Sequence, residues 1–177
     1  MYKRILIFVI TVACCIIIPN RYLFAKTYYQ KDNLFKIDVS DGWIWSQETD
    51  NISIKNPKTK NDIFIKYLPM FSFSDDAAKE LLKKGMQLII ATAVESVKGS
   101  VISENERWID GIYARQLEYT WHKDDSIVYT TRISFLYKNY LFTIQFSTQL
   151  QEENIVMGKM LETLKFLRDI SSPVGEK

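Results

Sequence analysis

One short stretch of the chain places potentially reactive side chains close together. His122 is followed by Asp124 and Asp125, and an imidazole with carboxylates can hold a divalent metal or transfer a proton. A hydrolase-type enzyme built on His122 is therefore one function to consider. However, the sequence contains no Gly-x-Ser-x-Gly motif, Walker loop or dinucleotide-binding glycine pattern. We interpret the three residues as the polar tip of a hairpin, and we expect no catalytic residue, metal or cofactor.

Four further carboxylates occur at nearby positions and offer groups for acid–base chemistry. They are Glu104, Glu106, Asp110 and Glu118. Residues two apart on a strand share one face, so Glu104 and Glu106 are expected to lie side by side. Carboxylates on an exposed strand face are usually solvated, and we expect that of this pair.

The first 25 residues are typical of a secretory signal. Lys3-Arg4 precedes an apolar run over 5–18, which is shorter than the roughly 20 residues that a membrane-spanning helix needs. A small residue, Ala25, ends the segment, and we predict cleavage between Ala25 and Lys26. The mature protein is then expected in the periplasm or outside the cell.

The same segment leaves lipidation open as an alternative. Ala13 is a small residue placed directly before Cys14, as attachment of a lipid to an exported protein requires. The apolar run continues past Cys14, which favours ordinary cleavage after Ala25 instead. A lipid on Cys14 would give the protein a peripheral contact with a membrane.

Cleavage would change the chemistry open to the remaining chain. Both cysteines lie in the signal, so disulfides, thiolate metal sites and cysteine nucleophiles would be lost with it. The signal also carries three basic residues and no acidic one, so its removal takes the formal net charge from +2 to −1. A chain so close to neutral gives no reason to expect nucleic-acid binding.

Hydrophobic periodicity predicts eight strands and two helices in the rest of the chain. Period-two alternation and turn residues such as Asp110-Gly111 indicate the strands, and apolar residues at three- and four-residue steps indicate the helices. Ser74 is the expected N-cap of the first helix. The expected strands are 35–39, 43–45, 51–55, 63–68, 101–109, 112–121, 127–137 and 140–146, and the expected helices are 74–94 and 151–166.

This order of elements predicts an α+β fold in which an antiparallel sheet is packed between two main helices, an α/β/α-type sandwich. About 150 residues suffice for one domain. We expect an N-terminal extension over 26–32, a single domain over 33–168 and a flexible tail over 169–177.

Several landmarks in this outline resemble those of the PsbP-like fold, which PsbP proteins of photosystem II, bacterial DcrB-type envelope proteins and a yeast Ran-binding import factor share. The landmarks are Phe35-Lys36-Ile37-Asp38-Val39, Asp41-Gly42-Trp43, Asn56-Pro57, Asp110-Gly111, Tyr140-Leu141-Phe142-Thr143-Ile144 and Leu161-Glu162-Thr163-Leu164-Lys165-Phe166. The resemblance covers about 33–167. It implies a non-enzymatic protein that docks onto other proteins, and the export signal points to the envelope branch.

Two surface segments are candidates for such docking. Met70, Phe71 and Phe73 precede the first helix and could meet a partner, since interfaces favour Met and aromatic residues. Phe73 could instead pack on the first helical turn as a hydrophobic staple. Lys58 and Lys60 make the turn of the first hairpin basic; they could meet an acidic partner or anionic lipid, or only keep edge strands from pairing.

The sequence therefore favours an exported, non-enzymatic binding or assembly module that acts on another envelope or secreted protein. The alternative is a small-ligand carrier whose aromatic residues line a cavity. Trp43 and Trp45 share a strand face, and we expect both to contribute to the core.

Overall fold

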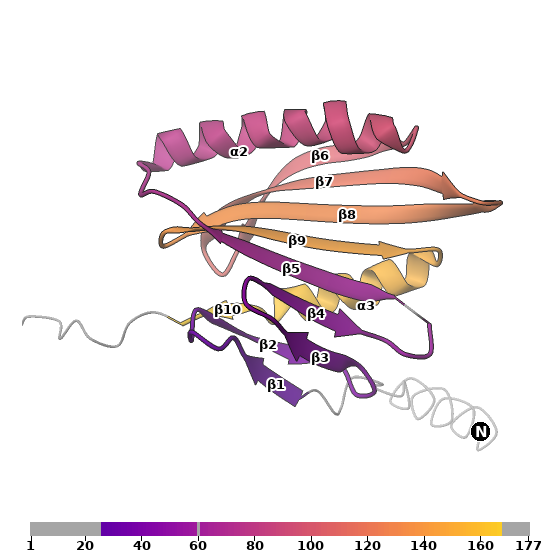
Figure 1. Ribbon diagram of the computed structural model, residues 1–177, viewed down its shortest axis with the longest axis horizontal. Coiled ribbons are helices and arrows are strands. Elements are labelled where there is room, and N and C mark those ends of the chain that lie inside the picture. Colours follow the sequence, from indigo (N-terminus) through magenta and orange to yellow (C-terminus); the bar gives the residue numbers. More distant parts are fainter. Residues whose placement is uncertain (1–25, 60, 168–177) are drawn as a thin grey trace, which may run out of the picture.

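The protein is built from two antiparallel sheets and two main helices, as seen in a computed structural model that describes residues 26–59 and 61–167. The seven-stranded sheet has the order β3-β4-β5-β9-β8-β7-β6 (Figure 1). Its strands are β3 Ile44–Gln47, β4 Asn51–Lys55, β5 Asp62–Pro69, β6 Ser100–Ile109, β7 Ile112–Lys123, β8 Ser126–Tyr137 and β9 Tyr140–Thr148. The three-stranded sheet, β1-β2-β10, contains β1 Lys26–Tyr29, β2 Phe35–Val39 and β10 Lys165–Phe166. The predicted α+β class is confirmed.

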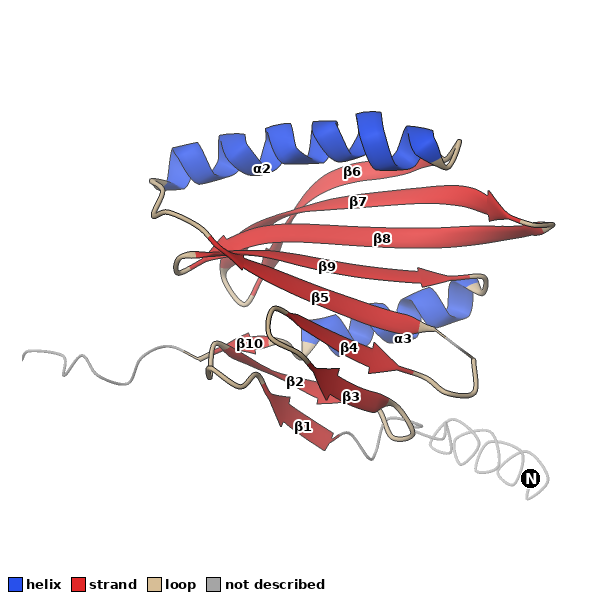
Figure 2. Ribbon diagram, viewed as in Figure 1, coloured by secondary structure: helices blue, strands red, loops and turns tan. Residues whose placement is uncertain are grey.

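The two helices lie on opposite faces of the large sheet. Helix α2 (Asp75–Ile89) packs on β7 and β8, and α3 (Gln151–Glu162) packs on β9 and β2. Figure 2 shows α2 along the β6–β7 side of the sheet, whereas β3, β4 and β5 lie away from it. The face that α2 covers on β7 and β8 is therefore uncovered further along the sheet.

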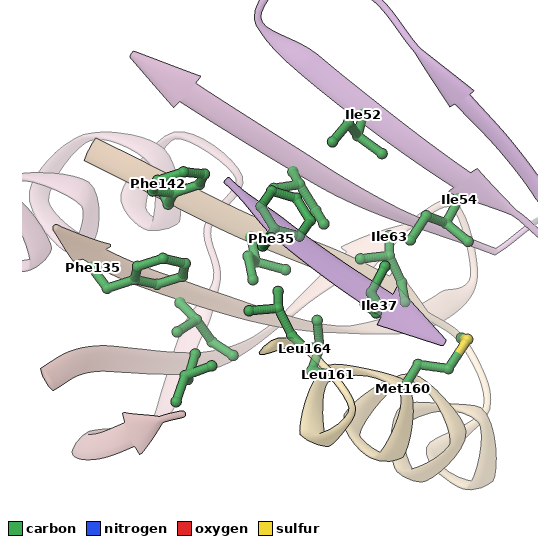
Figure 3. Close-up of a cluster of buried hydrophobic side chains, with 14 of the residues drawn as sticks. Phe35, Ile37, Ile52, Ile54, Ile63, Phe135, Phe142, Met160, Leu161 and Leu164 are labelled. Carbon is green, nitrogen blue, oxygen red and sulfur yellow. The ribbon is translucent and has the colours of Figure 1, made fainter. Parts of the chain in front are cut away.

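The main core lies between the large sheet, the small sheet and α3. Figure 3 shows Phe35, Phe135 and Phe142 among aliphatic side chains from β4, β5 and α3. The rings of Phe135 and Phe142 stack with centroids 5.0 Å apart, and Phe35 meets Phe142 edge-on at 5.9 Å. All three are fully buried. These aromatic side chains fill the core, whereas the carrier hypothesis had them lining a cavity.

The predicted strand faces follow from this core. Alternate residues of β4 and β5 point inward, including Ile52, Ile54, Ile63 and Ile65, which have no exposed surface. Trp43 and Trp45 are partly buried and pack against the same cluster. Trp45 also stacks on Tyr28 at 5.1 Å, which ties β3 to β1.

The first helix begins where the sequence predicts. The Ser74 side chain accepts a hydrogen bond from the Ala77 amide at 3.5 Å, and Asp75 and Asp76 occupy the first turn, where the helix dipole favours acids. Leu82 and Met86 are buried against the sheet. The α-helix ends at Ile89 and continues as a π-helix, η1, over Ile90–Val94, so the predicted end near Val94 holds for the combined segment.

The end of the last helix was predicted wrongly. It stops at Glu162, and the next residues turn into β10. Thr163 Oγ1 donates to the Met160 carbonyl at 2.7 Å and accepts from the Asp38 amide at 2.9 Å, which fixes the turn against β2. Phe166 can then pair with Phe35.

The N-terminal part of the described chain also differs from the single-sheet expectation. β1 lies within residues 26–32 and pairs along its whole length with β2. β2 has the predicted bounds, but it joins the small sheet with β1 and β10. The buried Gln30 shapes the connection, since its side-chain oxygen accepts from the amides of Asp32 and Leu34.

The predicted signal over residues 1–25, with Cys14 and Ala25, lies outside the described residues, and so does the whole predicted tail over 169–177. Within the described ranges, no helix is long and apolar enough to cross a membrane.

Candidate binding face

His122, Asp124 and Asp125, the residues suggestive of catalysis, line none of the three hollows described below. His122 is exposed near the end of β7, and Asp124 and Asp125 form the exposed turn that follows. Across residues 26–59 and 61–167, no group of three or more His, Cys, Asp or Glu side chains is arranged to hold a metal.

Glu104 and Glu106 share a strand face as expected, but they are not simply solvated. Arg115 on the neighbouring strand β7 contacts both: its Nη2 donates to Glu104 Oε1, and its Nη1 donates to Glu106 Oε1 at 3.2 Å. The hydrogen bond with Glu104 is the main cause that raises the pKa of Arg115 above its ordinary value. The two glutamates thus join β6 to β7 through Arg115, and this structural role accounts for their position.

The exposed apolar side chains of β5 and the loop after it form a more distinctive feature. Phe64 is 39% exposed and Leu68 is 40% exposed, and Phe71 is 87% exposed just beyond the end of β5. Monomeric proteins seldom leave several large apolar side chains uncovered along one run unless a partner covers them. We call Phe64, Lys66, Leu68, Met70 and Phe71 the β5–α2 surface.

Strand register places this surface on the face that α2 partly covers. Phe64, Lys66 and Leu68 lie directly across from Gln145, Thr143 and Leu141 of β9. Residues directly opposite in an antiparallel pair point to the same side of the sheet. Leu141 and Thr143 lie beneath α2, so the three β5 side chains belong to the same face, where the helix no longer covers it.

A cavity of about 140 Å³ lies between α2 and this face. Met70 lines this cavity and also belongs to the β5–α2 surface, so the cavity and the surface are continuous. Its remaining lining residues come from α2, β8 and β9: Leu81, Leu82, Gly85, Met86, Ile89, Arg132, Ser134, Leu141 and Thr143. We call it the Arg132 cavity.

Arg132 is the unusual residue of this cavity. Its Nε is buried and has no hydrogen-bond partner, and within the described part of the chain its guanidinium forms no ion pair. Burial lowers the pKa of Arg132 from its ordinary value. Arginine remains protonated nonetheless, so a charge is held in a largely apolar site without a counterion.

The other predicted contact residues are dispersed. Lys58 is exposed in the β4–β5 turn, and Lys60 lies outside the described residues. Met70 lines the Arg132 cavity, Phe71 is almost fully exposed and Phe73 is 39% exposed. Met70 therefore lies against the face that α2 covers, Phe71 lies exposed in the loop next to it, and docking of a partner there stays a prediction.

Sequence reasoning missed Arg132 altogether. It is the only charged residue in β8, and this signal could have singled it out. Trp108, which lies in the strand expected over 101–109, is 63% exposed and meets Tyr113 edge-on at 5.7 Å, and both rings line a second hollow of about 230 Å³. A third hollow, of about 440 Å³, is lined by Trp121, Asp62 and Lys123 among others at the far end of the sheet.

The sequence itself matches no family model, and it matches no curated protein. Solved structures do match. A cyanobacterial PsbP (CyanoP) from Synechocystis superimposes with a TM-score of 0.60 over 81% of this chain and 92% of its own, at 14% identity. The chain has a PsbP-like fold.

Two further structures share this PsbP-like fold. LpqN of Mycobacterium tuberculosis, described as involved in cell envelope biogenesis, matches with a TM-score of 0.53 over 82% of this chain and 91% of its own, at 12% identity. The Ran-binding protein Mog1p of Saccharomyces cerevisiae matches with a TM-score of 0.51 over 78% and 84% of the two chains, at 13% identity. At these identities the likeness concerns the fold.

Replacing Arg132 by Met is expected to stabilise the protein. The substitution removes a partly desolvated charge and keeps a chain of similar length, so the free energy of unfolding should rise by about 0.5–1 kcal/mol. The expected gain in stability is small because Arg132 is only partly buried and its charge is still partly solvated. Urea unfolding measures the change in the free energy of unfolding. Arg115→Met is the matched control, and it should destabilise the protein because Glu104 loses its partner. A destabilised R132M protein would mean that Arg132 is already compensated.

Gly85→Ala is also expected to stabilise the protein. A Cβ at Gly85 would meet nothing within 4 Å, and Ala favours a helix interior over Gly by about 1 kcal/mol. Gly99→Ala is the opposite case, because its Cβ would lie 2.8 Å from the Thr120 carbonyl oxygen. Thermal unfolding of the two variants should therefore shift in opposite directions, and a destabilised G85A protein would refute the open space beside Gly85.

Proposed function

We propose that this protein is an exported, non-enzymatic binding module that docks onto another envelope protein through the β5–α2 surface. The observation that carries the proposal is that Phe64 and Leu68 stay uncovered on one face of the sheet, and that Phe71 follows them, 87% exposed, in the loop that leads to α2. Apolar and aromatic side chains of this kind supply most of the binding energy at protein interfaces.

The charge on this face indicates what the partner should present. Lys66 lies between Phe64 and Leu68 on the same side of β5, so the uncovered apolar side chains flank a positive charge. A partner segment with apolar and acidic residues would match both features. The predicted export signal and the involvement of LpqN in cell envelope biogenesis support the choice of an envelope protein.

The proposal is tested by quantitative affinity capture from an envelope extract. Wild-type protein is compared with a Phe64→Ala/Phe71→Ala variant and with Ile155→Ala, a matched control because Ile155 is 58% exposed on α3, on the opposite face. One protein should be captured by wild type and I155A and reduced at least tenfold with the double variant. Equal capture by all three would refute docking through the β5–α2 surface.

A further inference from the structure

The floor of the Arg132 cavity carries three polar side chains from two neighbouring strands. Ser134 of β8 lies directly across from Thr143 of β9, and Arg132 precedes Ser134 by two residues on the same face. All three line the cavity. Within residues 26–59 and 61–167, none of these side chains makes a hydrogen bond or ion pair with another residue. A guanidinium and two hydroxyls are thus available to a ligand.

The cavity has a positive charge and lacks a negative one. Its ten lining residues include Arg132 and no acidic residue. Charged groups held away from water are normally paired, and the planar donors of a guanidinium match the two oxygens of a carboxylate. The two hydroxyls can donate to the same oxygens. The missing counterion is therefore best supplied by a carboxylate from outside the chain.

The walls of the cavity determine what else the ligand must carry. Seven lining residues remain besides the three polar ones, and six of these have apolar side chains: Met70, Leu81, Leu82, Met86, Ile89 and Leu141. The seventh is Gly85, whose missing side chain leaves open space beneath the helix. An apolar cavity of about 150 Å³ is known to hold a six-carbon ligand, benzene. The volume of about 140 Å³ here suits an apolar chain of similar size.

We infer that the Arg132 cavity binds a small amphipathic monocarboxylate, with its carboxylate on Arg132, Ser134 and Thr143 and an unbranched chain of about six carbons beneath α2. This is a ligand site in its own right. It does not depend on the protein docking proposed above, because no side chain of a partner is needed to fill it.

Calorimetric titration of the purified protein with hexanoate tests the site. Hexanoate should bind with saturation at one site per chain, and acetate and hexanol should bind at least tenfold more weakly, since each lacks half of the recognised chemistry. Arg132→Met should lower the affinity for hexanoate at least tenfold and leave that for hexanol unchanged. Gly85→Leu should fill the cavity and abolish binding of both.

Matched controls keep the result interpretable. Arg107→Met makes the same substitution on the opposite face of the sheet, where Arg107 Nη1 donates to Gln116 at 2.7 Å, and it should leave hexanoate binding unchanged. Urea midpoints show that each variant is folded. The site would be refuted if hexanoate does not saturate the wild-type protein, if R132M binds it equally well, or if hexanol binds as tightly. Capture of a partner in the docking experiment is unaffected by any of these results.

Discussion

Phe142→Ala is expected to lower the free energy of unfolding by about 3–5 kcal/mol. Phe142 has no exposed surface, and its ring contacts Phe35, Phe135, Tyr67 and Phe166. These residues come from both sheets, so the cavity left by the substitution would lie where the two sheets meet. Urea unfolding monitored by circular dichroism measures the loss.

Phe64→Ala is the matched control for this prediction. Phe64 lies on the adjacent strand β5, but it is 39% exposed and points to the other face. The same substitution should there cost about 1 kcal/mol or less, and it should act on partner binding instead. If the two variants were equally destabilised, the assignment of one face to the core and the other to binding would be wrong.

Asp110→Ala is expected to cost about 2–3 kcal/mol. Asp110 lies in the β6–β7 turn, where its Oδ2 accepts from the Phe166 amide at 2.9 Å and its Oδ1 accepts from Lys165 Nζ at 3.1 Å. It thereby joins a turn of the large sheet to β10 of the small sheet. Loss of a carboxylate acceptor leaves the Phe166 amide unpaired, and Ala at the φ of +47° found at this position is disfavoured.

Asp110→Asn separates the two contributions. Asn tolerates a positive φ in a two-residue hairpin turn and keeps one oxygen for the Phe166 amide, so we expect a loss of about 1 kcal/mol. Thermal unfolding of both variants provides the measurement. Equal losses for Ala and Asn would show that the charge matters and that the backbone conformation and the amide contact do not.

The sequence predicted local structure well because local structure depends on local patterns. The alternation of Phe35, Ile37 and Val39 was sufficient to predict β2, and Asp110-Gly111 was sufficient to predict a hairpin turn. Ser74 and the apolar repeat after it predicted the start and the buried face of α2. In each case the deciding residues lie within one element.

Features that depend on distant pairing were not predictable in the same way. Alternation in β2 indicates a strand, but it carries no information on which sheet the strand joins. β10 has only two residues, and it exists because Phe166 reaches β2 and Asp110 across the fold. The helix predicted over 151–166 therefore wrongly included the two residues of β10.

The candidate site shows the same division. The exposed aromatic segment at Met70 and Phe71 could be proposed from residue types alone. The isolation of Arg132 as the one charged residue of β8 could have been noticed in the sequence, but its burial could not be predicted, because that depends on residues of other elements. Its significance comes from the absence of a counterion among the described residues of β7, β9 and α2, which only the packed structure shows.

The central claim, that the β5–α2 surface is where a partner docks, is tested most directly by photo-crosslinking in cells. A photoreactive amino acid is placed at Phe71 in one full-length protein and at Ile155, on the opposite face, in another. We predict a discrete crosslinked product from position 71, no such product from position 155, and loss of the first when Phe64 is also replaced by Ala. Crosslinking from position 155 but not from position 71 would contradict the account.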